Sequence, residues 1–357
     1  MNYELNFEAE PFEVYSEFDE SEETLGESAI VSHPRLGFGR SVPRQAEIEQ
    51  GEDSGLIMHP RLGLGRSVAH EEEFDEGEDV EIIPPTDDRH RVSNTLEIPH
   101  RWICRLDIYF PDPDKPGHDL LFCGSGTLVS PRHVLTAGHC LWDEVTGSRG
   151  TKVRRKANKI IVTPGCNGVD GQGKRKQPFG NATSNKLRYR KAWEVSGASK
   201  DDFGLITLNA AIGAKPQRAL GNRPLGFWGC PRYGGNTRIT PLDPKLWKTK
   251  PLTIAGYPGD KCGPVPAVGS ASDAQIAACS INKWASDQWR ANGKVRNVSA
   301  NRVSYDVDTF GGESGAPVWL PWQNFRNLVA VHTTGTPSYN EGVLITQALW
   351  HEVKSWM

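Results

Sequence analysis

From residue 102 onward the chain is divided into short apolar runs, and Gly, Pro, Asn and Asp separate one run from the next. Runs of this length without helical periodicity between them are typical of an all-β barrel or sandwich. Only the end of the chain differs: after Thr346, Leu349, Val353 and Trp356 recur at helical spacing and predict a short C-terminal helix. The expected strands are residues 102–110, 120–129, 133–136, 159–163, 203–208, 252–257, 303–307, 316–320, 328–332 and 343–345.

One glycine-rich segment, residues 308–317, reads DTFGGESGAP and predicts an exposed turn that presents a nucleophile. Glycine allows the backbone to approach a substrate closely and adopts dihedral angles that other residues avoid. We expect Ser314 to be the nucleophile. The backbone amides of Gly312 and Ser314 could then hold the negative oxygen that develops when a carbonyl is attacked.

Two upstream motifs supply the partners that a serine nucleophile needs. Residues 135–140 read LTAGHC and place His139 after an apolar strand, and Asp202 begins the segment DFGLITL. A serine hydroxyl needs an imidazole to take its proton, and a carboxylate fixes the tautomer of that imidazole. The chain order His139, Asp202, Ser314 is the order found in chymotrypsin and predicts hydrolysis of peptide bonds through an acyl-enzyme intermediate.

These segments resemble the chymotrypsin-like serine proteases, and further details resemble the bacterial glutamyl endopeptidases among them. Those details are IIPPTDDRH, GYPGDK, YDVDTFGG and the histidine of AVHTTG. The resemblance covers residues 82–357 and implies two six-stranded antiparallel barrels, one at about 100–210 and the other at about 225–345, followed by a helix at about 347–356. It implies that the active site lies between the barrels, with His139 and Asp202 on the first and Ser314 on the second.

The same resemblance implies cleavage after Glu, with Asp as an alternative. Thr309 and His332 stand where glutamyl endopeptidases line the specificity pocket, and both side chains can donate hydrogen bonds to a substrate carboxylate. Asp308 lies six residues before Ser314, where an aspartate in related enzymes favours Lys or Arg, so this residue leaves another specificity open. Glu313 could pair with a new N-terminal ammonium group.

The first 81 residues form a leader with a composition unlike that of a folded domain. They contain 22 acidic and 5 basic side chains, a net charge of −17, whereas residues 82–357 carry a net charge of +14. Too little apolar content predicts a largely disordered pro-segment that solubilises the basic domain or folds back on it. The N-terminus lacks the pattern of an ordinary signal peptide, so we expect secretion by a route that the sequence does not show.

A decapeptide is repeated within this leader. HPRLGFGRSV at residues 33–42 recurs as HPRLGLGRSV at residues 59–68. Two copies are too few for a solenoid. Two interpretations remain, a duplicated linker and a docking motif.

The leader is expected to end between Glu81 and Ile82, where the resemblance places the first residue of the mature enzyme. Cleavage after a glutamate suits self-processing by a glutamate-specific enzyme. The chain is therefore expected to be made as a zymogen, and the ammonium group of Ile82 could reach Glu313.

Seven cysteines contain no CxxC pair, so no zinc site is expected. The resemblance implies a disulfide between Cys123 and Cys140, beside His139. Two further pairings are candidates, Cys262 with Cys279 and Cys166 with Cys230, and Cys104 is then left over.

No run of about 18 apolar residues predicts a membrane span. The basic clusters at residues 152–156, 174–176 and 186–191 accompany no nucleic-acid-binding module, so solvated loops are the preferred interpretation. We expect a monomer without a cofactor or metal whose partners are glutamate-containing proteins or peptides. Two alternatives remain open: a chymotrypsin-like protease of other specificity and a pseudoprotease that binds partners without cutting them.

Overall fold

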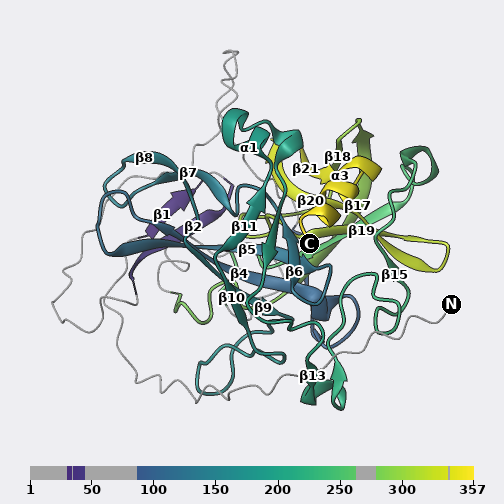
Figure 1. Ribbon diagram of the computed structural model, residues 1–357, viewed down its shortest axis with the longest axis horizontal. Coiled ribbons are helices and arrows are strands. Elements are labelled where there is room, and N and C mark those ends of the chain that lie inside the picture. Colours follow the sequence, from purple (N-terminus) through teal and green to yellow (C-terminus); the bar gives the residue numbers. More distant parts are fainter. Residues whose placement is uncertain (1–29, 34, 45–86, 263–278, 337) are drawn as a thin grey trace.

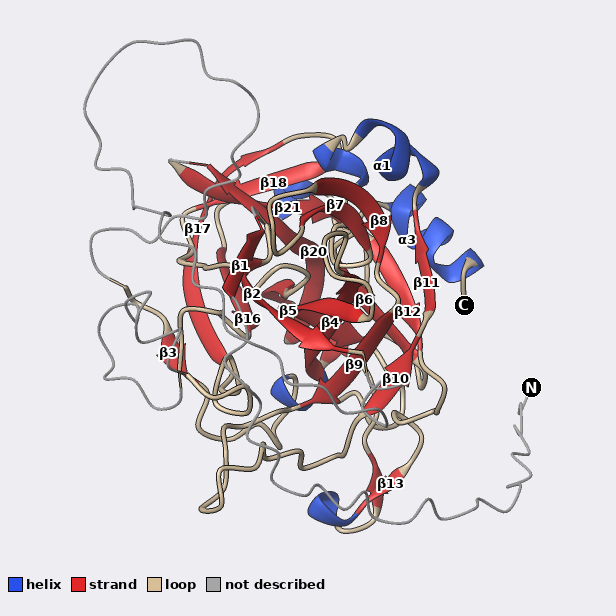
Figure 2. Ribbon diagram, turned by 90° about the vertical axis from the view of Figure 1, so that its left-hand side faces the viewer, coloured by secondary structure: helices blue, strands red, loops and turns tan. Residues whose placement is uncertain are grey.

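The computed structural model describes residues 30–33, 35–44, 87–262, 279–336 and 338–357. Two large β-sheets, both almost wholly antiparallel, form barrel-like bodies that pack against each other, and helices contribute little (Figures 1 and 2). The all-β architecture expected from the short apolar runs is therefore confirmed.

The second sheet closes on itself as a six-stranded barrel. Its strands follow the spatial order β16, β17, β18, β21, β20 and β19, and β19 pairs with β16 to complete the ring. A short strand, β15, joins β20 in parallel, and β3 joins β17. The bounds are β3 His90–Arg91, β15 Thr237–Arg238, β16 Pro251–Gly256, β17 Trp289–Val298, β18 Arg302–Tyr305, β19 Pro317–Trp322, β20 Phe325–Thr336 and β21 Tyr339–Leu344.

The first sheet has nine strands among the described residues rather than the predicted six. Seven of them follow the order β10, β9, β4, β5, β6, β12 and β11, and two strands of the leader, described below, complete it. No pairing between described residues joins β10 to β11. The long strands β4 and β5 are almost wholly buried and lie next to each other in the middle of this sheet. The bounds are β4 Ile103–Pro111, β5 His118–Leu128, β6 His133–Thr136, β9 Lys159–Pro164, β10 Ala182–Ser184, β11 Lys186–Tyr189 and β12 Gly204–Thr207.

Shorter elements decorate the two bodies. Two small two-stranded sheets are formed by β7 with β8 and by β13 with β14. The helix α1 precedes Asp202, and single turns of 3-10 helix occur in the connections. The bounds are β7 Trp142–Thr146, β8 Lys152–Lys156, α1 Lys191–Ser196, β13 Pro216–Gln217, β14 Arg223–Pro224, η2 His100–Trp102, η3 Ser199–Asp201, η4 Arg218–Leu220 and η5 Pro244–Leu246.

The predicted C-terminal helix is present as α3, Gln347–Ser355. The hydroxyl of Thr346 caps its first turn by accepting a hydrogen bond from the amide of Leu349 at 3.1 Å. Trp356, just beyond the helix, stacks on Phe203 with ring centroids 5.6 Å apart. Because Phe203 belongs to the first body, the helix ties the end of the chain back across the molecule.

Part of the leader departs from the predicted disorder. Residues Ile30–His33 form β1 and residues Gly37–Pro43 form β2, and the two strands make an antiparallel hairpin. This hairpin joins the first sheet through β5 (Figure 2). The rest of the leader, including the second copy of the decapeptide and the expected processing site at Glu81 and Ile82, lies outside the described residues.

A buried cluster of charges lies where residues 87–89 meet the second body. The guanidinium of Arg89, whose side chain is fully buried, contacts Asp87 at 2.9 Å, Asp260 at 2.6 Å and Glu313 at 3.6 Å. Lys261 adds a second cation, 2.7 Å from Asp87. A buried charge is tolerated only when it is paired in this way.

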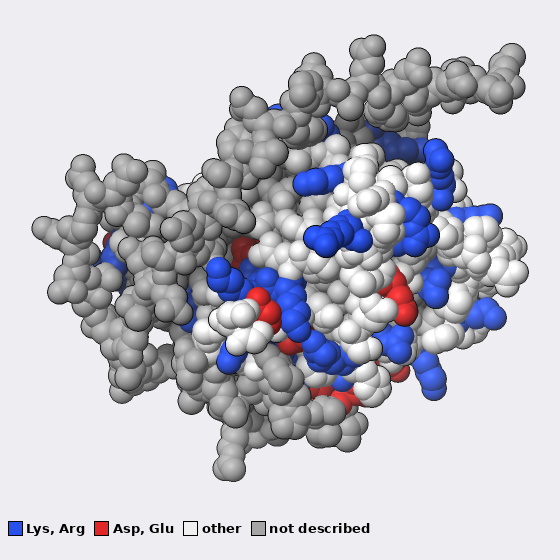
Figure 3. Space-filling view, turned by 90° about the horizontal axis from the view of Figure 1, so that it is seen from below, with Lys and Arg blue, Asp and Glu red and all other residues white. Residues whose placement is uncertain are grey.

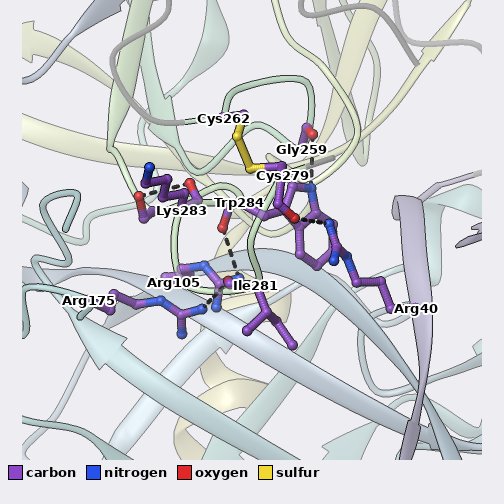
Figure 4. Close-up of a disulfide and its surroundings, with 10 residues drawn as sticks. Arg40, Arg105, Arg175, Gly259, Cys262, Cys279, Ile281, Lys283 and Trp284 are labelled. Atoms are coloured by element: carbon purple, nitrogen blue, oxygen red, sulfur yellow. Dashed lines mark hydrogen bonds between the residues drawn. A yellow bond between two sulfur atoms is a disulfide. The ribbon is translucent and has the colours of Figure 1, made fainter. Parts of the chain in front are cut away.

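The cysteines correct one prediction and confirm another. Cys262 and Cys279 form a disulfide (Figure 4). Cys123 and Cys140 do not, because each thiol instead donates to a backbone carbonyl: Cys123 to Tyr257 at 3.4 Å and Cys140 to Ser314 at 3.6 Å. The predicted pairing beside His139 is therefore wrong. Cys166 and Cys230, a candidate pair, do not form a disulfide either, and Cys104 is also a free thiol.

None of the helices among the described residues is long and apolar enough to cross a lipid bilayer.

Replacement of Arg89 by Met should destabilise the fold by about 3–5 kcal/mol, because three carboxylates would then share only Lys261 inside the protein. Urea unfolding followed by tryptophan fluorescence measures the change. The exposed Arg132, replaced by Met in the same way, should change stability by no more than about 0.5 kcal/mol. Equal midpoints for the two variants would show that the buried cluster does not stabilise the fold.

Candidate active site

His139 makes two hydrogen bonds to one carboxylate. Its backbone amide donates to Oδ1 of Asp202 at 2.8 Å, and its ring Nδ1 lies 2.8 Å from Oδ2. The turn after β6 makes this possible at Gly138, where a Cβ atom would lie only 3.1 Å from the same carboxylate. The predicted partners His139 and Asp202 are therefore together, with the ring oriented so that Nε2 is the nitrogen available for chemistry.

The pair also fixes the charge state of its members. Burial works to lower the pKa of His139, but the attraction of Asp202 and the hydrogen bond between them outweigh burial and raise that pKa well above its ordinary value. Burial likewise works to raise the pKa of Asp202, and the attraction of His139 lowers it overall. The carboxylate of Asp202 thus stabilises the protonated, positively charged form of the His139 imidazole.

The turn that carries Ser314 is wedged between the two bodies and depends on glycine at two positions. Gly312 has φ +102°, and a Cβ atom on it would lie 2.6 Å from the carbonyl of Tyr257. Gly315 has φ +86°, and a Cβ atom there would lie 2.1 Å from Oγ1 of Thr136, on β6 just before His139. Side chains are excluded at both positions, so the serine turn comes as close to the His139 segment as backbone allows.

The hydroxyl of Ser314 is engaged by the leader. It donates a hydrogen bond to the carbonyl oxygen of Arg35 at 2.7 Å. Nε2 of His139 is buried and has no hydrogen-bond partner among the described residues. The nucleophile and its expected base are therefore not hydrogen-bonded to each other while the leader hairpin is in place.

The amides of Gly312 and Ser314 were predicted to bind a developing oxyanion. Neither amide donates a hydrogen bond to any residue that the structure describes. Both lie in a turn whose other groups are satisfied, since the amide of Glu313 donates to Phe310 at 2.9 Å and the carbonyl of Ser314 accepts from Ser125 at 2.8 Å. Two donors are thus left for an external acceptor.

The expected specificity residues are both fully buried on the second body. Oγ1 of Thr309 has no hydrogen-bond partner among the described residues. Nδ1 of His332 lies 2.7 Å from the hydroxyl of Tyr305, which orients the ring. Asp308 lies next to Thr309, and burial raises its pKa to about 7. The hydrogen bond that the amide of Asp88 donates to Asp308 at 2.8 Å lowers this pKa, and the negative charge of the Asp88 carboxylate raises it.

Two residues of the site escaped the sequence analysis. Ser125, in the segment CGSG of β5, accepts the amide of Tyr257 at 2.9 Å and donates to the carbonyl of Gly312 at 2.8 Å, so one hydroxyl clamps the serine turn to both bodies. Arg89 pairs with Glu313, so this carboxylate has a cation inside the chain besides the ammonium group of Ile82 that was considered for it. Ser125 belongs to no motif singled out in the sequence, and Arg89 lies in the segment IIPPTDDRH, which was noted for its resemblance without a role for the arginine.

Comparison with known proteins agrees with this geometry. Over 279 residues the chain is 29% identical to the glutamyl endopeptidase of Bacillus licheniformis, and the match covers 76% of this chain and 67% of the relative. A solved structure of a Glu endopeptidase in complex with MPD superposes with a TM-score of 0.51 at 24% identity, covering 75% of this chain and 95% of that one. The chain is a glutamyl endopeptidase-like serine protease of the trypsin fold. It is accordingly a serine endopeptidase that acts on proteins or peptides.

A second relative of this glutamyl endopeptidase-like protease carries a different name. The extracellular metalloprotease of Bacillus subtilis is 25% identical over 272 residues, covering 76% of this chain and 68% of the relative. Within the described part of the chain, no group of three or more His, Cys, Asp or Glu side chains is arranged to hold a metal ion. No family model matches the chain.

Asp202→Asn should lower the pKa of His139, because the negative charge that holds the imidazolium is removed. NMR titration of the His139 ring in the full chain measures this shift, with His133, which has no acidic partner among the described residues, as the internal control. An unchanged His139 pKa would show that Asp202 does not control the charge of the ring.

Proposed function

We propose that Ser314, His139 and Asp202 hydrolyse peptide bonds on the carboxyl side of glutamate. Oγ of Ser314 attacks the scissile carbonyl carbon while Nε2 of His139 takes the hydroxyl proton. The imidazolium then gives this proton to the leaving amine, which departs and leaves an acyl-enzyme. Water attacks the ester by the same route in reverse, and the acid product and free Ser314 are released.

The observation that carries this proposal is the pair of hydrogen bonds from His139 to Asp202. The serine turn also has two backbone amides, of Gly312 and Ser314, that donate no hydrogen bond to a described residue. Asp202 stabilises the imidazolium that forms during attack, in keeping with the raised pKa of His139. The amides of Gly312 and Ser314 supply the donors for the oxyanion, which is worth several kcal/mol in a site that excludes water.

Glutamate specificity rests on hydrogen bonds rather than on a fixed positive charge. A substrate carboxylate that leaves water must find donors. The hydroxyl of Thr309 is buried without a described partner, and the ring of His332 is held by Tyr305. The surface outside the site adds long-range attraction, because the enzyme domain is basic and Lys and Arg outnumber acids on the face in Figure 3.

We further infer that the enzyme is made in a latent form and acts outside the cell. Release would follow cleavage between Glu81 and Ile82, which lie outside the described residues. The hydrogen bond from Ser314 to the leader supports latency, and the similarity to the extracellular metalloprotease of Bacillus subtilis supports an extracellular location.

Ser314→Ala should reduce kcat of the leader-free enzyme by roughly 10⁴-fold or more while leaving substrate binding largely intact. Hydrolysis of a fluorogenic peptide measures the loss, and labelling by a fluorophosphonate should disappear with it. Ser93→Ala changes an exposed serine and serves as the matched control. A Ser314→Ala enzyme that is still labelled and active would exclude this residue as the nucleophile.

Thr309→Val should reduce kcat/KM for a peptide with Glu at the cleaved position by about 10- to 100-fold, because a hydrogen bond to a charged group is lost. The matched peptide with Gln should be affected much less. Thr309→Ser keeps the hydroxyl and should retain most of the preference. An unchanged ratio of Glu to Gln cleavage in the valine variant would remove Thr309 from the specificity pocket.

A further inference from the structure

The leader hairpin lies on an open edge of strand β5. β4 occupies one edge of β5 along residues 119–127, and β6 uses the other edge at residues 127 and 128 only. β2 pairs with residues 118–122 of that second edge, beginning with Gly39 opposite Phe122. A Cβ atom on Gly39 would lie 2.3 Å from the Phe122 ring, so the fit requires glycine. This is the geometry of β-augmentation, in which an extended peptide adds a strand to a sheet.

The turn of the hairpin places Arg35 at the reacting groups. Its carbonyl accepts the hydroxyl of Ser314, and its guanidinium pairs with Asp143 at 3.0 Å. The same guanidinium lies over the ring of Trp193, 4.9 Å from the centroid. The next residue, Leu36, is fully buried in the main apolar core. The hairpin thus occupies the space that a substrate needs beside the nucleophile.

A second arginine anchors strand β2 itself. The guanidinium of Arg40 donates to the carbonyl of Cys279 and lies over the ring of Trp284, 5.9 Å from its centroid (Figure 4). Next to it, the hydroxyl of Ser41 lies 3.1 Å from the buried carboxylate of Asp112. These contacts attach β2 to both bodies, because Cys279 and Trp284 belong to the connection before β17.

The side-chain contacts described above come from the first decapeptide, and each of their residues recurs in the second. Outside the repeat, Pro43 pairs with His118 and the guanidinium of Arg44 lies 2.9 Å from Asp119. The only difference between the copies is Phe38 in the first and Leu64 in the second. The correspondence is one of sequence, since the second copy lies outside the described residues. The contact residues Arg35, Leu36, Gly39, Arg40 and Ser41 correspond to Arg61, Leu62, Gly65, Arg66 and Ser67.

We propose that the decapeptide HPRLGxGRSV is an inhibitory ligand of the active-site cleft and that either copy can fill it. The proposal rests on the proposed function, because it concerns access to Ser314. Tethering in the same chain gives each copy a high effective concentration at the cleft. Loss of one copy therefore leaves the enzyme latent.

The position of Arg35 beside Ser314 also explains why the enzyme does not cleave the bound decapeptide. The carbonyl beside Ser314 belongs to an arginine, which is not the residue that the proposed pocket accepts. The side chain of Arg35 is held by Asp143 and Trp193 of the first body, whereas Thr309 and His332 belong to the second. The hydroxyl of Ser314 donates to the carbonyl oxygen instead of giving its proton to His139.

Fluorophosphonate labelling of the uncut chain tests the equivalence of the copies. Arg35→Glu alone and Arg61→Glu alone should be labelled as slowly as the wild type. The double variant should be labelled at least about tenfold faster, because a glutamate at the Arg35 position of either copy would face Asp143. Double replacement by Lys keeps the charge and should remain slow. Full release by Arg35→Glu alone would show that the second copy does not substitute, and slow labelling of the double glutamate variant would show that the decapeptide does not inhibit.

Synthetic peptides test the ligand in trans on the uncut double glutamate variant. HPRLGFGRSV and HPRLGLGRSV should each restore slow labelling, to a similar extent. The matched peptide HPELGFGRSV, with the arginine reversed, should not. Restoration by all three peptides, or by none, would overturn recognition of this sequence by the cleft.

Hydrogen exchange separates this proposal from the proposed function, because it requires no catalysis. In the full-length Ser314→Ala chain, those amides of residues 118–122 that face β2 should exchange at least about tenfold faster when both arginines are replaced by Glu. Faster exchange, together with a leader-free enzyme whose Ser314 no fluorophosphonate labels, would retain the docking site and reject the hydrolase. Unchanged exchange in a protein whose wild-type form is labelled and active would retain the hydrolase and reject the docking site.

Discussion

The structure depends on the absence of a side chain at residue 315. The two bodies meet there so closely that a methyl group would overlap both Oγ1 of Thr136 and the carbonyl of Ser125. Because Thr136 ends the strand that leads to His139, this contact brings the imidazole and the serine turn from opposite halves of the chain to one place. Packed interiors deform little, so such a contact fixes the distance between reacting groups more firmly than a flexible side chain could. The hydroxyl of Ser125 and the carboxylate of Glu313 then hold the turn on its other sides.

The second constraint is electrostatic. Glu313, the residue directly before Ser314, is buried. Its carboxylate forms an ion pair with the guanidinium of Arg89. The peptide amide of Phe310 adds a hydrogen bond to the same carboxylate at 3.0 Å. Residues 87–89 and the serine turn are thus joined by one buried cluster of charges. The leader hairpin instead pairs with the first body, through β5.

Much of this could be predicted from sequence, and the failures have physical causes. Strands were found because their apolar residues are continuous and bounded by turn residues. The pairing of His139 with Asp202 was expected from their motifs and is present, and Ser314 stays the predicted nucleophile. The hairpin of the leader was missed because its order comes from contacts with distant residues, such as Asp143, and not from its own composition. The Cys123 to Cys140 pairing failed because proximity in a family pattern does not determine where two thiols point. Arg89 lies in a segment that carried the resemblance, but its role was missed, since the sequence does not show that an arginine is buried until its partners are known.

The pairing of β2 with β5 has a consequence for any form of the protein that lacks the hairpin. Without the hairpin, the amide and carbonyl groups of β5 that face β2 within residues 118–122 lose their partners, while β4 still pairs with the strand along residues 119–127. Such an open strand edge is a template for any extended segment, including the same edge on a second molecule. In a chain without the leader, the net charge of +14 on residues 82–357 would then oppose self-association.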